Sequence, residues 1–170
     1  HVRRGVVVDE GLHGMAGLLP EDADRAERER LYVANLRHAA EACAEKGITL
    51  LIEPINTRDI PGFLINYQRD GRRIIETVGA PNLKLQLALY HCQIMEGDLA
   101  LHVREFLPIT GHILIAGVPG RHEPDVGEIN YPYLFELLDE LGYQGWIGCE
   151  YRPKGRTEDG LGWFGRWRRE

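Results

Sequence analysis

The chain has 170 residues, of which 44% are hydrophobic and 27% are charged, and its net charge is −6 at pH 7. This length suits one globular domain with a sizeable core. No apolar run approaches the roughly 18 residues that a membrane span needs, and the acidic balance argues against broad nucleic-acid binding. We therefore expect a cytoplasmic protein with neither a membrane nor a nucleic acid as its partner.

Two further features concern the origin of the chain. It opens on His1 where a natural start would have Met, which favours a processed, trimmed or engineered chain. Cys43, Cys92 and Cys149 are odd in number and form no CxxC pair. We interpret them as small buried residues of a protein from a reducing compartment, with no disulfide framework and no zinc site.

The N-terminal part predicts strand without a crossover helix. Residues 5–9 (GVVVD) and 12–18 (LHGMAGL) are apolar runs separated by Glu10 and Gly11. Such a short link is typical of a hairpin or a bent strand, because a parallel crossover needs a dozen or more residues.

Four later segments predict strands, because they are short, apolar and rich in β-branched residues. They are residues 48–55 (ITLLIEPI), 83–90 (LKLQLALY), 112–117 (HILIAG) and 145–151 (GWIGCEY). Their starts are about 30 residues apart, a spacing that fits a repeated unit of strand, loop, helix and loop. Successive βα units indicate an α/β protein with a parallel sheet, either doubly wound or closed into a barrel, and periodicity leaves both open.

Helices are predicted between these strands from the 3.6-residue apolar period. The apolar faces fall in residues 32–43, in 99–107 after the N-cap residue Asp98, and in 134–141 after Asn130. The pattern in residues 67–78 is weaker because Gly71 interrupts it. After the polar segment of residues 154–162, we expect Trp163, Phe164 and Trp167 to pack against the rest of the domain.

The residues that could carry chemistry follow the predicted strands. Glu53 and Glu150 come directly after apolar strand residues, at the sheet edge where α/β proteins place their sites. A carboxylate there needs a partner or a metal, because burying it alone is unfavourable. An ion pair with a loop arginine is the alternative for each, and two glutamates at equivalent positions favour the functional interpretation.

Two more side chains follow the same strands. His91 could donate to a substrate hydroxyl and Arg121 could clamp a carboxylate, although a surface role is nearly as plausible for Arg121 and is the default for the neighbouring His122. The remaining histidines are interpreted as structural, since nothing in the sequence pairs them: His13, His38, His102 and His112.

These motifs resemble those of hydroxypyruvate isomerases and their 2-oxo-tetronate isomerase relatives. The resemblance runs over residues 12–167 and leaves residues 1–11 unmatched. Its segments are 15–18 (MAGL) with Pro20, 51–56 (LIEPIN), 90–93 (YHCQ), 121–132 (RHEPDVGEINYP), 145–151 (GWIGCEY) and 160–163 (GLGW).

The resemblance implies a xylose isomerase-like (β/α) TIM barrel that binds a divalent metal, Mg²⁺ or Mn²⁺, at its C-terminal mouth. It further implies an aldose–ketose isomerisation of a small 2-oxo or hydroxy acid through an ene-diol. By motif, Glu53 and Glu150 match the family's metal ligands and proton-transfer groups, and His91 and Arg121 match substrate contacts.

The sequence departs from the family pattern in three ways. Ala88 stands where the family has a metal-ligating Asp, and Leu114 stands where it has a ligating Gln. The recognisable part corresponds to about five of the eight strands, so we expect a single α/β domain, residues 1–170, forming a partial barrel. Because such a barrel has open edges, we also expect either a rearranged N-terminal segment or a homo-oligomer, for which a dimer is the simplest form.

Two functions remain open. The first is an isomerase whose activity is impaired or lost because its metal site is degraded. The second is a non-catalytic α/β scaffold, engineered or truncated from such an isomerase. A metal-dependent endonuclease of similar fold is disfavoured by the acidic balance and by the small number of potential metal-ligand histidines.

Overall fold

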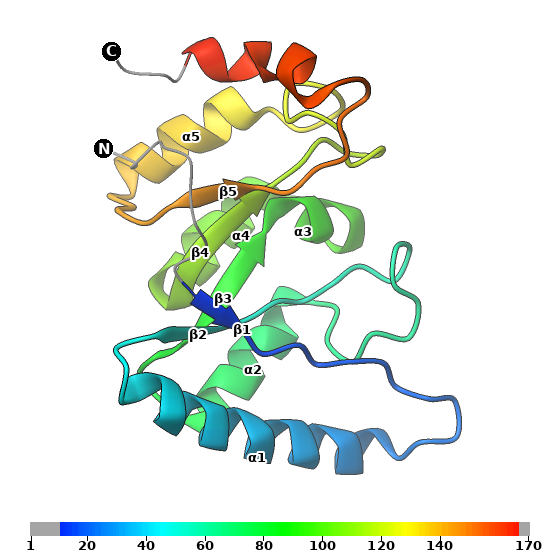
Figure 1. Cartoon of the computed structure of the whole chain (residues 1–170), viewed down its shortest axis with the longest axis vertical. Coiled ribbons are helices and arrows are strands. Elements are labelled where there is room, and N and C mark those ends of the chain that lie inside the picture. The colour runs from blue at the N-terminus through cyan, green and yellow to red at the C-terminus, as the bar shows by residue number, and fades with distance from the viewer. Residues whose placement is uncertain (1–10, 167–170) are drawn as a thin grey trace.

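The computed structural model describes residues 11–166, and it contains one sheet of five parallel strands in the order β1-β2-β3-β4-β5 (Figure 1). The strands are β1 (Gly11–His13), β2 (Thr49–Ile52), β3 (Leu83–Ala88), β4 (Thr110–Ile115) and β5 (Ile147–Cys149). The helices are α1 (Arg25–Ala44), α2 (Gln68–Val78), α3 (Leu89–Met95), α4 (Leu99–Phe106) and α5 (Tyr131–Glu140), with 3₁₀ turns η1 (Leu107–Ile109) and η2 (Thr157–Arg166). Strand order that follows chain order is typical of a barrel, and the five strands form about half of one.

The hydrophobic core lies between the sheet and the helices. Successive strand residues point to opposite faces of a sheet, so alternate residues of β3 and β4 share a face. Leu85 and Leu87 pack with Ile113 and Ile115 in a cluster that helices α4 and α5 complete, and β2 and α1 contribute to a second cluster. The other alternate residues, such as Gln86 and Leu114, line the concave face that becomes the interior of a closed barrel.

The predicted helices are present. Asp24 caps α1 by accepting from the backbone N of Ala26 at 2.8 Å, and Asn130 caps α5. Asp98 precedes α4 as expected, but its φ is +43° and its side chain makes no capping bond. Gly71 lies at a close approach of α2 to the sheet: a Cβ there would lie 2.6 Å from Leu85 Cδ1, so a side chain would force Leu85 to shift.

Three expectations need correction. The strand expected over residues 83–90 ends at Ala88, and residues 89–95 form α3 instead, so His91 lies in a helix. The strand expected over residues 48–55 is shorter, because Pro54 cannot donate to a sheet ladder and the segment leaves the sheet after Ile52. Within residues 12–18 the strand ends at His13, so most of that run is loop.

Of the remaining expectations, some are confirmed, one is wrong, and others concern residues outside the described range. Cys43 and Cys92 are buried free thiols as predicted, but Cys149 is exposed. Trp163 packs against the cluster between the sheet and α5, as expected of the C-terminal segment, whereas Trp167 lies outside the described residues. The run at 5–9, its hairpin or bent strand and any rearrangement of the N-terminal segment also lie outside them. Among the described residues, no helix is long and apolar enough to cross a membrane.

Candidate active site

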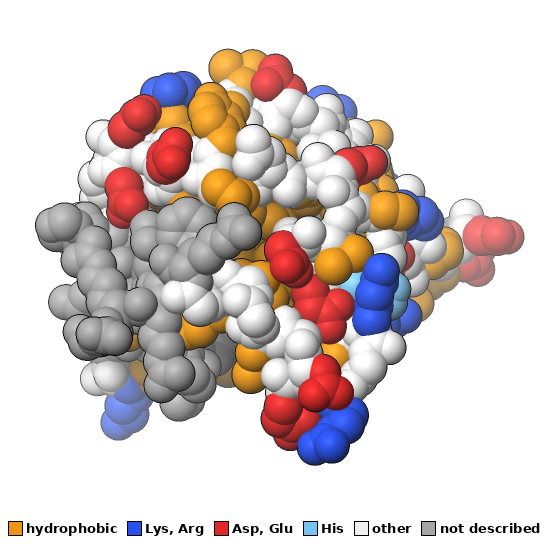
Figure 2. All heavy atoms as spheres, turned by 90° about the horizontal axis from the view of Figure 1, so that it is seen from above, with side chains coloured by type: hydrophobic (Ala, Val, Ile, Leu, Met, Phe, Trp, Pro, Cys, Tyr) orange, Lys and Arg blue, Asp and Glu red, His pale blue; other side chains and the backbone are white. Residues whose placement is uncertain are grey.

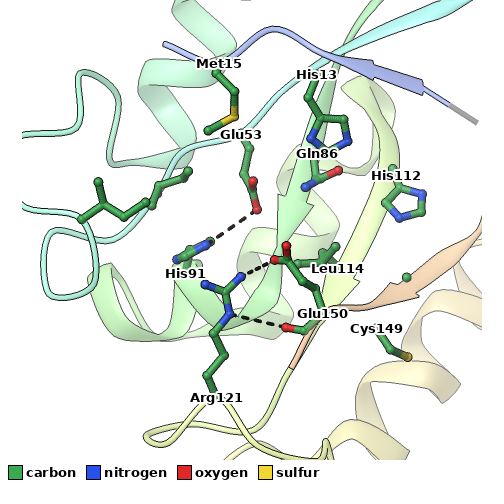
Figure 3. Close-up of a pocket in the computed structure, with 13 residues that line it drawn as sticks. His13, Met15, Glu53, Gln86, His91, His112, Leu114, Arg121, Cys149 and Glu150 are labelled. Carbon is green, nitrogen blue, oxygen red and sulfur yellow. Dashed lines mark hydrogen bonds and ion pairs between the residues drawn. The ribbon is translucent and has the colours of Figure 1, made fainter. Parts of the chain in front are cut away.

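A cavity of about 410 Å³ opens at the carboxyl ends of the strands and contains all four predicted site residues (Figure 3). Glu53 follows β2, Glu150 follows β5, His91 is on α3, and Arg121 is in the loop after β4. Parallel strands bring segments separated by almost 100 residues to this one mouth. The cavity is lined by His13, Met15, Glu53, Ile55, Ile60, Gln86, His91, His112, Leu114, Arg121, Gly148, Cys149 and Glu150.

Glu53 and His91 form a buried pair at the base of the cavity. His91 Nε2 lies 3.8 Å from Glu53 Oε1, and their side chains are 2% and 9% exposed. Burial lowers the pKa of His91 to about 4, and the positive charge of Arg121 acts in the same direction. The imidazole is therefore neutral near pH 7, and its interaction with Glu53 is that of a polar group beside a carboxylate rather than of two full charges.

The tautomer of His91 is set by Asn56, whose side chain is fully buried. Asn56 Oδ1 accepts from the backbone N of Asp59 at 2.7 Å, so the opposite end of the amide, Nδ2, faces His91 Nδ1 at 2.6 Å. The backbone N of Asn56 also points at Nδ1, at 3.3 Å. Two donors directed at Nδ1 require that this atom accepts, so the ring proton is on Nε2, the nitrogen nearer to Glu53.

Arg121 reaches the cavity from the loop after β4, and its guanidinium lies near His91 (Figure 3). Its Nη2 donates to the Glu150 carboxylate, and its Nε donates to the Glu150 backbone oxygen at 3.4 Å. The guanidinium also lies over the ring of Tyr90, 5.0 Å from the centroid. Arg121 has φ +56°, an uncommon backbone conformation for a residue with a side chain. These contacts orient the guanidinium and keep its charge beside Glu150 (Figure 3).

A second set of contacts fastens the loop after β2 to the loop after β4. Tyr90 donates its hydroxyl proton to Asp59 at 2.8 Å, and Arg58 Nη2 donates both to that hydroxyl at 3.1 Å and to the carbonyl oxygen of Pro119 at 2.8 Å. Because Asp59 also accepts from Asn56 Nδ2 at 3.2 Å, the Tyr90 and His91 networks are joined. The walls of the cavity are thus pre-organised by the chain itself.

Ala88 and Leu114 lie where the resemblance places two metal ligands. Ala88 is fully buried, and Leu114 lines the cavity with hydrocarbon. Of the two carboxylates at the mouth, that of Glu150 is already bonded to Arg121. Mg²⁺ and Mn²⁺ need several oxygen ligands in fixed positions, and the side chains of Ala88 and Leu114 supply none.

The sequence interpretation missed three polar residues of the cavity: His13, Gln86 and His112. Both histidines were interpreted as structural because nothing in the sequence pairs them. The available signal was the two-residue period of the strands, since Gln86 precedes Ala88 by two positions and His112 precedes Leu114 by two. That period places them on the same face as the expected ligand positions.

The chain is similar to known proteins both in sequence and in fold. A 2-oxo-tetronate isomerase from Cupriavidus necator is 60% identical over 94% of this chain, and the hydroxypyruvate isomerase of Escherichia coli is 43% identical over 91% of it. The chain spans 62% and 60% of the lengths of these relatives. A crystal structure of an AP endonuclease, family 2, from Brucella melitensis superposes with a TM-score of 0.90 at 48% identity, covering 94% of this chain and 62% of that one.

The pattern of one family covers nearly the whole chain. It is described as xylose isomerase-like TIM barrel and matches residues 4–167. Five parallel strands in chain order are consistent with part of such a barrel. The chain belongs to the xylose isomerase-like TIM-barrel family.

Proposed function

We propose that the cavity is the proton-transfer site of an aldose–ketose isomerase whose substrate is a small 2-oxo acid bearing a neighbouring hydroxyl, such as hydroxypyruvate. The observation that carries this proposal is the meeting of two glutamates, an arginine and a neutral histidine in one cavity. The names of the relatives, which are isomerases of such acids, support the same substrate class.

Glu53 is the better candidate for the base. Its side chain is 9% exposed, whereas that of Glu150 is 63% exposed and bonded to Arg121. In the proposed reaction Glu53 removes a proton from the hydroxyl-bearing carbon beside the carbonyl, and the C–H electron pair forms the double bond of an ene-diolate. The proton then returns to the neighbouring carbon, and a proton moves between the two oxygens, so that the product is an isomer.

His91 and Arg121 would supply the binding contacts. His91 carries its proton on Nε2, so it can donate a hydrogen bond to the oxygen on which negative charge develops. The planar guanidinium of Arg121 fits the two oxygens of a substrate carboxylate. Glu150, which already holds that guanidinium, would position it and serve as the second proton-transfer group.

We further propose that turnover is weak. In a metal-dependent isomerase a divalent cation polarises both substrate oxygens. Here Ala88 and Leu114 give no donor atoms, so Mg²⁺ or Mn²⁺ would bind weakly or not at all, and electrophilic assistance falls to His91 and Arg121. The alternative, a non-catalytic scaffold derived from such an isomerase, rests on the same two residues.

Hydrogen exchange at the substrate distinguishes the two functions. The exchange of the CH₂ protons of hydroxypyruvate with D₂O can be followed by ¹H NMR. We expect this exchange to be faster in the presence of the protein than in buffer alone. The variant Glu53→Gln removes the base while keeping its shape and should return the rate to the buffer value. A wild-type rate equal to that of buffer, with and without Mn²⁺, would leave the scaffold as the correct alternative.

A homo-oligomer is also proposed. In the sheet of residues 11–166, β1 and β5 are the end strands. Pairing with a second copy would cover an exposed strand edge. Sedimentation equilibrium should give twice the chain mass, and a monomer at micromolar concentration would contradict the proposal.

A cytoplasmic location is proposed as well. The free cysteines fit a reducing compartment such as the cytoplasm.

A nucleic-acid substrate, which the name of the Brucella melitensis structure raises, is not proposed. Acidic and basic side chains are interspersed on the face at the α5 and η2 end of the molecule (Figure 2), and the formal net charge is −6. Phosphate-backbone binding depends on a concentrated basic surface.

A further inference from the structure

Three potential metal-ligating side chains meet where α3 joins α4, in a group separate from the active-site cavity. One ligand atom from each of Cys92, Glu96 and His102 lies within 4.8 Å of the other two. We propose that these three residues form a binding site for a zinc-like divalent cation.

Local structure brings the three residues together. Cys92 and Glu96 are four residues apart at the end of α3, a spacing that places them on one face of the helix. His102 lies in the first half of α4. Between the two helices, Gly97 and Asp98 both have positive φ, +68° and +43°, which turns α4 back against α3.

Glu96 is oriented by a contact outside the cluster. Its Oε1 accepts from the backbone N of Gln68, at the start of α2, at 2.8 Å. Its Oε2 lies 3.9 Å from His102 Nε2. A carboxylate fixed by one oxygen presents the other in a defined position, as ligating carboxylates commonly do.

Two residues linked to the cluster, Gln68 through its backbone N and His102 as a member, have buried side-chain atoms without a hydrogen-bond partner among residues 11–166. Gln68 is fully buried, and neither Nε2 nor Oε1 of its amide has a hydrogen-bond partner among residues 11–166. His102 Nδ1 is likewise buried without one. A buried polar group without a hydrogen bond is unfavourable, so this corner of the core is suited to a polar occupant.

The chemistry of the three ligands selects the class of cation. Cys92 would bind as the thiolate, so the cation would replace the thiol proton. A thiolate and a carboxylate together neutralise a divalent cation, which favours burial of the complex. Sulfur, nitrogen and oxygen ligands suit Zn²⁺, whereas Mg²⁺ and Ca²⁺ prefer oxygen alone.

Zinc binding would require the three ligand atoms to move closer together. Zinc–ligand bonds of about 2.0–2.3 Å in a tetrahedron put ligand atoms about 3.5 Å apart, so the cluster must contract by about 1 Å at its widest. Rotation of the His102 and Glu96 side chains, which are 16% and 11% exposed, supplies such movement. Three protein ligands leave a fourth position, which water could fill.

Cobalt binding tests the site directly. In the background Cys43→Ala/Cys149→Ser, Cys92 is the sole thiol, so any thiolate-to-Co²⁺ charge-transfer absorption comes from it. We expect one equivalent of Co²⁺ to produce this absorption and Zn²⁺ to abolish it by displacement. Adding His102→Gln or Glu96→Gln should weaken Co²⁺ binding at least tenfold, with folding checked by circular dichroism.

Two controls separate this site from others. His38→Gln alters an exposed histidine of α1 and should leave the absorption unchanged. Glu53→Gln/Glu150→Gln removes the carboxylates of the active-site cavity and should also leave it unchanged. Absence of the absorption in the background chain, or equal Co²⁺ affinity after His102→Gln, would overturn the proposal. A rise in the wild-type melting temperature with Zn²⁺ that is lost in His102→Gln gives a second readout, independent of the cysteine substitutions.

Discussion

His91 Nδ1 and Asn56 Nδ2 lie 2.6 Å apart, although 35 residues separate them in the chain. An amide nitrogen only donates, so this contact fixes the ring proton of His91 on Nε2, beside Glu53. In the proposed reaction this makes His91 a hydrogen-bond donor to substrate. Asn56 is therefore a positioning residue for the neutral imidazole.

The substitution Asn56→Ala should release that tautomer. We expect the ¹⁵N spectrum of the His91 ring to change from one tautomer to a mixture, and the free energy of unfolding to fall by about 1–3 kcal/mol. Asn82→Ala is the matched control: Asn82 Nδ2 also donates to backbone oxygens, of Ala40 and Ile48, and its loss should reduce stability alone. An unchanged His91 tautomer in Asn56→Ala would show that the backbone N of Asn56 suffices.

Stability should depend on pH through His91. Burial lowers its pKa from the ordinary 6.5 to about 4, so between these values the unfolded chain binds more protons than the folded one. The contribution of His91 is therefore fully present above pH 6.5 and is lost as the pH falls toward 4. Urea unfolding at several pH values should show this slope in the wild type and a shallower one in His91→Gln. Equal slopes would mean that other groups carry the acid sensitivity.

Restoring the two missing ligands should create a metal-dependent gain in stability. In Ala88→Asp/Leu114→Gln we expect the melting temperature to fall without metal, because position 88 is fully buried, and to rise on addition of Mn²⁺. A concentration 100 times the dissociation constant stabilises by about 2.7 kcal/mol. The same double substitution with Glu53→Gln should respond less. No response to Mn²⁺ in either variant would mean that the mouth does not assemble a metal site.

Gly71 should be intolerant of a side chain. The variant Gly71→Ala would place Cβ 2.6 Å from Leu85 Cδ1 and 3.3 Å from Pro54 Cγ, so we expect a loss of about 1–3 kcal/mol despite the better helix propensity of alanine. Gly155→Ala is the control, because nothing lies within 4 Å of its Cβ position. Equal unfolding free energies for the two variants would show that α2 can shift away from the sheet.

The strand positions were predictable to within a few residues, because a buried parallel strand has a recognisable apolar composition. The residue at which a strand ends and the next element begins was not predictable. The segment of residues 83–95 contains neither proline nor glycine, so nothing in it marks the change from β3 to α3 at Leu89. His91 was for this reason expected directly after the strand, and its contact with Asn56 was not predicted.

The sequence by itself determined the class of the fold and the end of the sheet at which the polar residues gather, because these follow from local hydrophobic period and from the common direction of parallel strands. Only the tertiary structure decided which atoms meet. The neutral state of His91 depends on burial, its tautomer depends on Asn56, and the cluster of Cys92, Glu96 and His102 depends on the turn at Gly97 and Asp98. Each is a property of the separation of groups in space, and a pattern of neighbours along the chain does not contain it.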